Sequence, residues 1–330
     1  MNLFGVPDSQ GMEVLAFLSV DGEEKGLELF RRFYRGLTYL ALFHYPVDAK
    51  GEISGTIDKT IVDQAHSFGV KVLLVLSNFV GKQFNPFIMR NIFLHRDIQD
   101  NLLQNLTTML QQNQLDGVNL DLENMFAEDR ALFSAFISRL AGALRAAGKV
   151  VTLSVPAKLQ DDPQAHWRGA FDYRTLGQAV DRVVLMTYEE HWAASTPGPV
   201  ASTPWVNGVL NYATSQIIPA KLYLGLPMYG YDWPMDNGTG KTVTHSRALH
   251  LASRYNARIV WDDVMQAPHF TYTDEQGTVH RVWFEHVASA QAKIALARQY
   301  GLRGLAVWEM KLTFPEFWQY IINNVPVAKV

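Results

Sequence analysis

Cysteine is absent from the 330-residue sequence, and its absence excludes several kinds of chemistry. Disulfide bonds, thiolate nucleophiles and metal sites built on thiolates cannot form. The sequence also lacks an uncharged apolar run of about 18 residues, so we expect no membrane-spanning helix. Residues 1–8 contain no basic segment followed by an apolar run, and they predict no signal peptide.

An excess of either charge is lacking as well. The chain has 29 Lys and Arg residues against 32 Asp and Glu residues, which gives a net charge of −3. Nucleic acid is therefore not an expected partner, because proteins that bind it present a basic surface. Aromatic residues are plentiful, and although most of them are expected in the core, 8 Trp and 13 Tyr offer faces that suit sugar rings.

Short apolar runs alternate with longer amphipathic segments along the whole chain. The runs that have the length of buried strands are residues 14–19, 39–43, 72–76, 118–122, 150–155, 182–187, 222–226 and 304–307. Helical spacing of apolar residues is found between them, for example at 23–35, 57–68, 98–112 and 129–147. Gly69 and Gly148 follow two of these segments, as helix C-caps do. The alternation predicts an α/β fold, a (β/α)8 TIM barrel, with a doubly wound sheet as the alternative.

The last two predicted strands are too far apart for a simple connection. About 80 residues separate them, whereas connections in compact domains usually take only a few residues. The excess contains a helical segment at 246–255 and a hairpin-like pair at 270–273 and 279–283. We therefore expect two parts. Residues 1–231 and 284–330 form a catalytic barrel, and residues 232–283 form a small inserted α+β subdomain at its catalytic face.

The most informative segment is Asp116-Gly-Val-Asn-Leu-Asp-Leu-Glu123. Asn119, Asp121 and Glu123 occupy every second position, so in a strand they share one face. The two carboxylates then lie about 7 Å apart along that face. Because two such groups cannot both ionise easily in a confined site, one carboxyl should have a raised pKa and serve as a general acid. The alternative is that they are solvent-facing charges on an edge strand.

This segment resembles the strand-four signature of glycoside hydrolase family 18, the family of chitinases and related N-acetylglucosaminidases. The family pattern is Asp-Gly-x-Asp-x-Asp-x-Glu, and Asn119 stands where the family usually has Asp. Further segments, at 185–192, 224–233, 282–285 and 304–308, resemble the spore-cortex-lytic N-acetylglucosaminidase branch of that family. The resemblance covers nearly the whole chain.

The resemblance implies roles for the catalytic residues. Glu123, at the end of strand four, would protonate the glycosidic oxygen. In this family the 2-acetamido oxygen of the substrate attacks the anomeric carbon, in place of a protein carboxylate. Asp121 would orient the acetamido N–H and stabilise the oxazolinium ion that forms. The Tyr188 hydroxyl would hold the acetamido carbonyl.

The remaining site residues are implied to bind the substrate. Asn119 cannot share a proton with Asp121 as a carboxyl would, but its amide can donate a hydrogen bond that favours ionised Asp121. Met186 and Glu189 would line the same subsite, where the family usually has Asp in place of Glu189. Trp308, at the predicted barrel mouth, would be the floor on which a sugar ring stacks.

Taken together, the sequence and the resemblance predict a hydrolase that cleaves peptidoglycan after N-acetylglucosamine, with spore-cortex fragments as substrate. A chitin or chito-oligosaccharide hydrolase and a non-catalytic glycan-binding protein remain alternatives. Glu189, Glu190 and His191 are adjacent and do not converge on one ion in extended chain, so we predict no metal, and no cofactor either. We expect a monomer, and the resemblance implies a place in the spore envelope or cell wall.

Overall fold

The computed structural model of the protein describes residues 11–19, 23–236 and 238–330. Residues 1–8, which predict no signal peptide, lie outside the described residues. Parallel strands close into a barrel in the order β1-β15-β9-β8-β7-β6-β3-β2. Their bounds are β1 (Glu13–Ser19), β2 (Tyr39–Pro46), β3 (Lys71–Ser77), β6 (Gly117–Asp121), β7 (Val150–Pro156), β8 (Arg182–Met186), β9 (Leu222–Pro227) and β15 (Gly304–Trp308). Each predicted strand is present, and the TIM barrel is confirmed.

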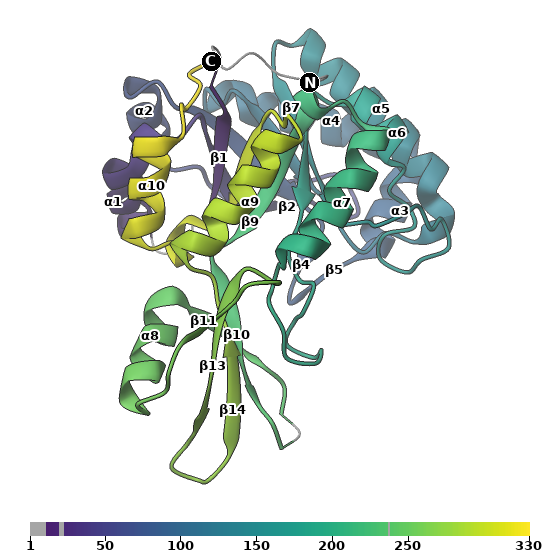
Figure 1. Cartoon of the computed structure of the whole chain (residues 1–330). Coiled ribbons are helices and arrows are strands. Elements are labelled where there is room, and N and C mark those ends of the chain that lie inside the picture. Colours follow the sequence, from purple (N-terminus) through teal and green to yellow (C-terminus); the bar gives the residue numbers. More distant parts are fainter. Residues whose placement is uncertain (1–10, 20–22, 237) are drawn as a thin grey trace.

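Helices form a layer around this barrel (Figure 1). They are α1 (Glu23–Phe33), α2 (Lys59–Ser67), α3 (Pro86–Leu94), α4 (Arg96–Gln112), α5 (Arg130–Ala146), α6 (Tyr173–Ala179), α7 (Thr203–Gln216), α9 (Val287–Gln299) and α10 (Pro315–Asn324). Short 3-10 turns lie at Tyr34–Gly36, Ala127–Asp129, Pro219–Lys221 and Met310–Leu312. A small hairpin, β4 (Phe79–Val80) and β5 (Gln83–Phe84), follows β3. Of the helices in the described part of the chain, none has the length and apolar character needed to cross a bilayer.

Alternate strand residues divide between two apolar cores. Leu15 and Phe17 of β1 belong to a small cluster that fills the barrel. Val14 and Leu18, which alternate with them, belong to the larger cluster between the strands and the helices. The predicted helix ends are also found: Gly69 and Gly148 have positive φ values of 67° and 72°, which a glycine adopts without a steric penalty.

The first two residues of the strand-four segment have structural functions. A Cβ atom at Gly117 would lie 2.0 Å from the Val150 carbonyl oxygen, so only glycine allows β6 and β7 to approach here. The Asp116 carboxylate accepts hydrogen bonds from the Val72 N–H and from His66 Nε2, each at 2.8 Å. These contacts fix the start of β6 and therefore the position of the polar residues that follow.

The segment between β9 and β15 carries the inserted antiparallel sheet, which extends from one end of the barrel (Figure 1). The sheet has the order β11-β10-β14-β13-β12. Its elements are β10 (Tyr229–Pro234), β11 (Lys241–Thr244), α8 (His245–Arg254), β12 (Val260–Asp262), β13 (Ala267–Thr273) and β14 (Val279–Trp283). The predicted helix and hairpin are thus present. Strand β10 spans position 232, and the division of the chain into domains at 231 and 284 stays a prediction.

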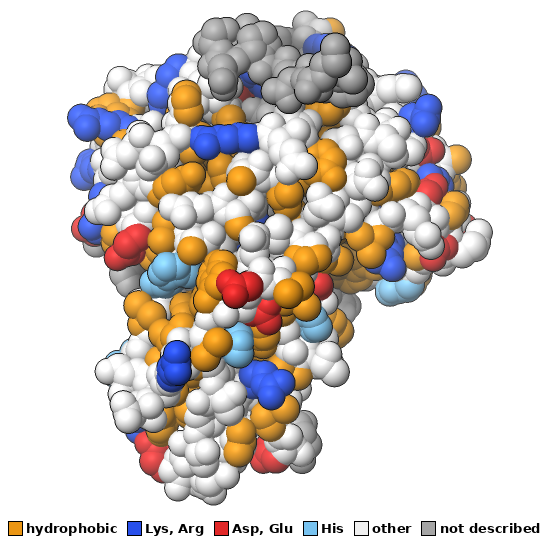
Figure 2. Space-filling model, viewed as in Figure 1, with side chains coloured by type: hydrophobic (Ala, Val, Ile, Leu, Met, Phe, Trp, Pro, Cys, Tyr) orange, Lys and Arg blue, Asp and Glu red, His pale blue; other side chains and the backbone are white. Residues whose placement is uncertain are grey.

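The face of the molecule drawn in Figure 2 carries charges of both signs. Lys and Arg side chains are scattered on it among hydrophobic and uncharged ones, and they do not gather in one basic patch. This distribution on the drawn face agrees with the small net charge of −3.

Candidate active site

Strand β6 directs its polar residues away from the helix layer. Val118 and Leu120 belong to the core beneath the helices, whereas Asn119 and Asp121, which alternate with them, are buried outside that core. Glu123 follows two residues after the end of β6 and continues the same alternation. It therefore lies at the C-terminal mouth of the barrel, where barrel enzymes place their chemistry.

The backbone of Glu123 is held by a side chain from the neighbouring strand. The Glu123 N–H donates to Asn78 Oδ1, and Asn78 Nδ2 donates to the Glu123 carbonyl oxygen, each at 2.9 Å. Asn78 follows β3 directly and is fully buried. This pair of hydrogen bonds fixes the main chain from which the Glu123 carboxyl extends. Asn78 was not among the residues that the sequence singles out, because nothing in its local pattern distinguishes it from a loop residue.

The two carboxyls of the motif interact electrostatically. Burial raises the pKa of Asp121. Burial also raises the pKa of Glu123 well above its ordinary value, and the negative charge of Asp121 raises it further. An ionised Asp121 therefore favours the protonated form of Glu123. This coupling suits Glu123 to donate a proton while Asp121 acts as an anion.

A tryptophan that no sequence pattern indicated lies near enough to Glu123 to affect its ionisation. The Trp167 side chain lowers the pKa of Glu123 by favouring the ionised carboxyl, against the effects of burial and of the Asp121 charge, which raise it. Trp167 lies in the connection 157–172 between β7 and α6 and is 38% exposed. The signal that could have identified it is a lone tryptophan in a polar connection that follows the C-terminal end of a barrel strand.

Tyr188 lies close to both carboxyls. It follows β8, and burial together with the charges of Asp121, Glu123 and Glu189 raises the pKa of its hydroxyl well above the ordinary value. Tyr188 therefore stays protonated and can donate a hydrogen bond. A Cβ atom at Gly225 would lie 3.0 Å from the Tyr188 ring, so the glycine in β9 leaves room for that ring.

Glu189 is tied to the inserted sheet. Although much of the residue is exposed, its carboxylate accepts hydrogen bonds from the hydroxyls of Tyr229 and Tyr231 in β10, with the Tyr231 oxygen 3.0 Å from each carboxylate oxygen. Burial of the carboxylate raises its pKa. The tyrosine hydroxyls therefore hold Glu189 beside Tyr188 and join the site to the base of the insertion.

The last two predicted residues end their strands at the same mouth. Trp308 ends β15 and packs edge-on against Phe17 and Phe43, with ring centroids 5.4 Å and 4.8 Å away. Trp308 and Tyr188 both pack against the buried aromatic cluster at the base of the insertion. Met186 ends β8 and is partly exposed. Asp121, Glu123 and Glu189 thus lie near enough to Tyr188 for their charges to raise its pKa, and Trp308 and Met186 end the barrel strands β15 and β8, which flank β9.

Comparisons with known proteins agree with this arrangement. The sequence pattern described as glycosyl hydrolases family 18 matches residues 16–312. The chain belongs to this family. It is therefore a glycoside hydrolase, and its similarity to the proteins below relates it to the spore cortex-lytic enzymes.

Three similar proteins illustrate the relationship. The cortical fragment-lytic enzyme of Bacillus cereus is 31% identical over 298 residues, which cover 89% of this chain and 69% of that protein. The crystal structure of the Bacillus cereus spore cortex-lytic enzyme SleL has a TM-score of 0.92 at 29% identity, covering 97% of this chain and 76% of that one. A chitinase from Chromobacterium violaceum has a TM-score of 0.87 at 28% identity, with 94% and 98% covered.

Asn119, the departure from the usual family pattern, is directed toward β7. Its Nδ2 donates to Thr152 Oγ1 at 2.7 Å, and its Oδ1 accepts from the Ser154 hydroxyl at 3.1 Å. The expected hydrogen bond to Asp121 is replaced by these two bonds, because Thr152 lies directly opposite Asn119 in the sheet register. Asn119 is fully buried, and its two hydrogen bonds join β6 to β7. Its predicted part in substrate binding stays a prediction.

Aromatic rings form a continuous row along the mouth of this family 18 barrel. Successive centroids lie 4.7 to 6.2 Å apart along the row. The rings belong, in order, to Trp308, Phe43, His44, Phe79, Phe84 and Trp167. The row connects the strand end at Trp308 with Trp167, whose side chain affects the pKa of Glu123, so the row passes along the site.

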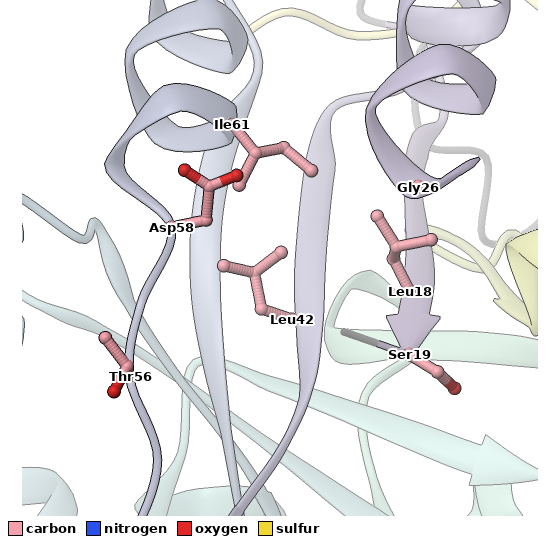
Figure 3. A pocket seen from close by; sticks show the side chains of 7 residues that line it. All are labelled: Leu18, Ser19, Gly26, Leu42, Thr56, Asp58 and Ile61. Carbon is pink, nitrogen blue, oxygen red and sulfur yellow. The ribbon is translucent and has the colours of Figure 1, made fainter. Parts of the chain in front are cut away.

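The pocket drawn in Figure 3 lies elsewhere. Leu18, Leu42 and Ile61 line it, and these side chains belong to the core outside the barrel strands, between α1 and α2. None of the predicted site residues is among the described residues that line it. The pocket contains one carboxyl, Asp58, which caps α2, so it lacks the paired carboxyls found at the barrel mouth. Within the described ranges, no three His, Cys, Asp or Glu residues are grouped to hold a metal ion.

Proposed function

We propose that the protein cleaves peptidoglycan after N-acetylglucosamine, with spore-cortex fragments as substrate. The family and the similarity to enzymes named for cortical fragments support this substrate. The observation that carries the catalytic part is the pairing of Asp121 with Glu123, in which burial and the charge of Asp121 raise the pKa of Glu123. Such a carboxyl is protonated where an ordinary one would be ionised, as a general acid requires.

Glu123 donates its proton to the glycosidic oxygen as the bond to the anomeric carbon breaks. The carboxylate that remains then removes a proton from the water that attacks in the second step. Both roles need the carboxyl at one fixed position above the sugar. The two hydrogen bonds between the Glu123 backbone and Asn78 support that requirement.

The nucleophile is the 2-acetamido oxygen of the substrate. Asp121, ionised beside Glu123, accepts the acetamido N–H and stabilises the positive charge of the oxazolinium ion. Tyr188 donates its O–H to the acetamido oxygen, which its raised pKa supports. Two displacements at the anomeric carbon leave its configuration unchanged, so the enzyme is expected to retain the β configuration.

The partly exposed rings at the barrel mouth would bind the glycan. Trp308 would form the floor of the subsite for the cleaved sugar, with Met186 and Glu189 at its edge. The aromatic row from Trp308 to Trp167 contains six rings, so it is longer than the surface on which one sugar ring stacks. This extent favours binding of several sugar units and hence cleavage within a glycan chain.

Hydrolysis of chitin oligomers is the second candidate. The similarity to the Chromobacterium violaceum chitinase, which spans 98% of that chain, favours it. Both substrates carry the 2-acetamido group, so the same residues would perform the same chemistry. A non-catalytic glycan-binding role is disfavoured by the presence of Glu123, the residue that such proteins usually lose.

Parallel digestion of cortex fragments and chitin oligomers tests the proposal. The new reducing ends are labelled by reduction and identified by mass spectrometry, with the Glu123→Gln variant as the control. We expect new N-acetylglucosamine ends from cortex fragments and little cleavage of chitin. New ends on N-acetylmuramic acid, or cleavage of chitin alone, would overturn the proposed substrate or bond.

A further inference from the structure

The inserted sheet has two faces with different surroundings. Helix α8 covers one face, where its Leu251 shares an apolar cluster with Phe270 of β13 and Val282 of β14 (Figure 1). Because side chains alternate along a strand, the residues between these positions point to the other face. We call that other face the site face. It carries Tyr229, Tyr231 and Trp233 of β10, Val279, Arg281 and Trp283 of β14, and His269, Thr271 and Thr273 of β13.

The site face continues from the barrel mouth along the insertion. The Tyr231 hydroxyl donates to Glu189, which follows β8. Trp283 lies directly opposite Tyr231 in the sheet register. Both belong to the buried aromatic cluster against which Tyr188 and Trp308 pack. A glycan bound at the barrel mouth can therefore extend along this face.

Arg281 places a positive charge on the site face. It lies directly opposite Trp233 of β10 and Thr271 of β13. Along its own strand, Val279 and Trp283 are the neighbours that point the same way. All four neighbours are uncharged, and within the described ranges no carboxylate forms an ion pair with Arg281. Its side chain is exposed, so the guanidinium is available to an anion from outside the protein.

Other arginines of the protein have carboxylate partners. Arg130 pairs with Asp161, with the nearest nitrogen and oxygen 2.7 Å apart. Arg254, on α8 at the other side of the same insertion, pairs with Glu275. Arg281 thus differs from arginines whose charge serves the fold.

Polar groups surround the guanidinium on the site face. His269 stacks on Trp283, with ring centroids 4.4 Å apart, and Thr271 lies beside it on β13. Burial lowers the pKa of His269, the charge of Asp262 raises it, and the charge of Arg281 lowers it. The Asp262 carboxylate itself accepts two backbone N–H groups of the turn that follows, at 2.9 Å and 2.8 Å. The face therefore offers an imidazole and a hydroxyl next to the cation.

These groups suit a carboxylate, because a guanidinium presents paired N–H donors that match its two oxygens. Chitin carries no charge. Peptidoglycan carries carboxylates, either on the free lactyl group of N-acetylmuramic acid or on the stem peptide attached to that group. We propose that Arg281 binds such a carboxylate on the glycan and thereby favours peptidoglycan over chitin. This inference rests on the proposed substrate.

Arg281→Gln tests the proposal, with Arg254→Gln as the matched control. Each variant removes one positive charge from the insertion, and Arg254 lies on the face that α8 covers. Calorimetry in a Glu123→Gln background gives Kd values without consuming the glycan. Three oligomers of equal length are compared: a peptidoglycan fragment with its peptides, the same fragment after an amidase has removed them, and a chitin oligomer.

We expect Arg281→Gln to raise the Kd by about three-fold to ten-fold for the fragment that carries the recognised carboxylate, and not for the chitin oligomer. A loss confined to the fragment with peptides would assign the carboxylate to the stem peptide. A loss confined to the amidase-treated fragment would assign it to the lactyl group. Arg281→Lys should retain part of the affinity, and added salt should reduce the difference between Arg281→Gln and its parent.

Two results would overturn the proposal. One is a set of Kd values for Arg281→Gln that equals the control for all three oligomers, and the other is an equal loss of affinity for the chitin oligomer. Cleavage of the same oligomers by the wild type separates this inference from the proposed function. If the wild type cleaves chitin alone, the proposed substrate fails, while a loss of affinity that depends on the carboxylate still supports the role of Arg281.

Discussion

The negative charge of Asp121 adds to burial in raising the pKa of Glu123, which continues the alternation of β6. The two carboxyls therefore lose their protons as a coupled pair, in which ionised Asp121 favours the protonated form of Glu123. Between the two ionisations the pair consists of one anion and one acid. That state is the one in which Asp121 can stabilise a cation while Glu123 protonates a leaving group.

Glu123→Gln should lose about 10³-fold or more in kcat, because both the acid and the base function disappear. Glu128→Gln is the matched control, since Glu128 is 68% exposed and pairs with Arg90 on the surface. Steady-state rates on a natural glycan, with circular dichroism to verify folding, measure the effect. Turnover near the wild-type rate would show that Glu123 is not the acid.

The same substitution should stabilise the fold at neutral pH. The pKa of Glu123 is raised in the folded protein above its unfolded value of about 4.3. As the pH rises past that value, the unfolded chain loses its proton first, so the free energy of unfolding of the wild type decreases. Glu123→Gln has no such proton to lose.

Thermal unfolding at two pH values therefore distinguishes the two proteins. At about pH 7 the Tm of Glu123→Gln should exceed that of the wild type, and at about pH 4 the difference should become small. Glu128→Gln should show no comparable increase. A lower Tm for Glu123→Gln at neutral pH would mean that the carboxyl is better stabilised than its burial implies.

Asp121→Asn should lower kcat severely while leaving substrate binding largely intact, because the charge of Asp121 acts mainly on the developing oxazolinium ion. Removing that charge should also lower the pKa of Glu123, so the alkaline limb of the residual activity should move to lower pH. Calorimetric binding of a chitin oligomer and a pH–rate profile measure the two effects. A large loss of affinity with kcat preserved would contradict the assignment.

Tyr188→Phe should lower kcat by about 10²-fold to 10³-fold, the range for loss of one hydrogen-bond donor to developing charge. KM should change little. Tyr212→Phe is a suitable control, because Tyr212 packs against Tyr173 on the helix layer. Equal effects of the two substitutions on kcat would indicate that Tyr188 only contributes to packing.

The barrel could be predicted from the sequence because each strand carries its own signal. Val14 and Leu18 face the helices while Leu15 and Phe17 fill the barrel, and this division follows from alternation alone. The motif could be placed for the same reason, since the spacing of Asp121 and Glu123 determines which face they share.

The partners of the site residues could not be predicted, because they come from distant parts of the chain. Asn78 binds the backbone of Glu123 across 45 positions, and Tyr231 binds Glu189 across 42 positions. Trp167 lies in a connection without periodicity, where no pattern indicates the direction of a side chain. These contacts depend on the packing of the closed barrel and not on local spacing.

The configuration of the first product is the most direct test of the proposed mechanism. Proton NMR during early cleavage of an N-acetylglucosamine-containing glycan distinguishes the anomers of the new reducing end before they interconvert. We predict that the β anomer appears first, because attack by the acetamido oxygen followed by water retains the configuration. Initial formation of the α anomer would contradict the substrate-assisted mechanism and the roles of Asp121 and Tyr188 in it.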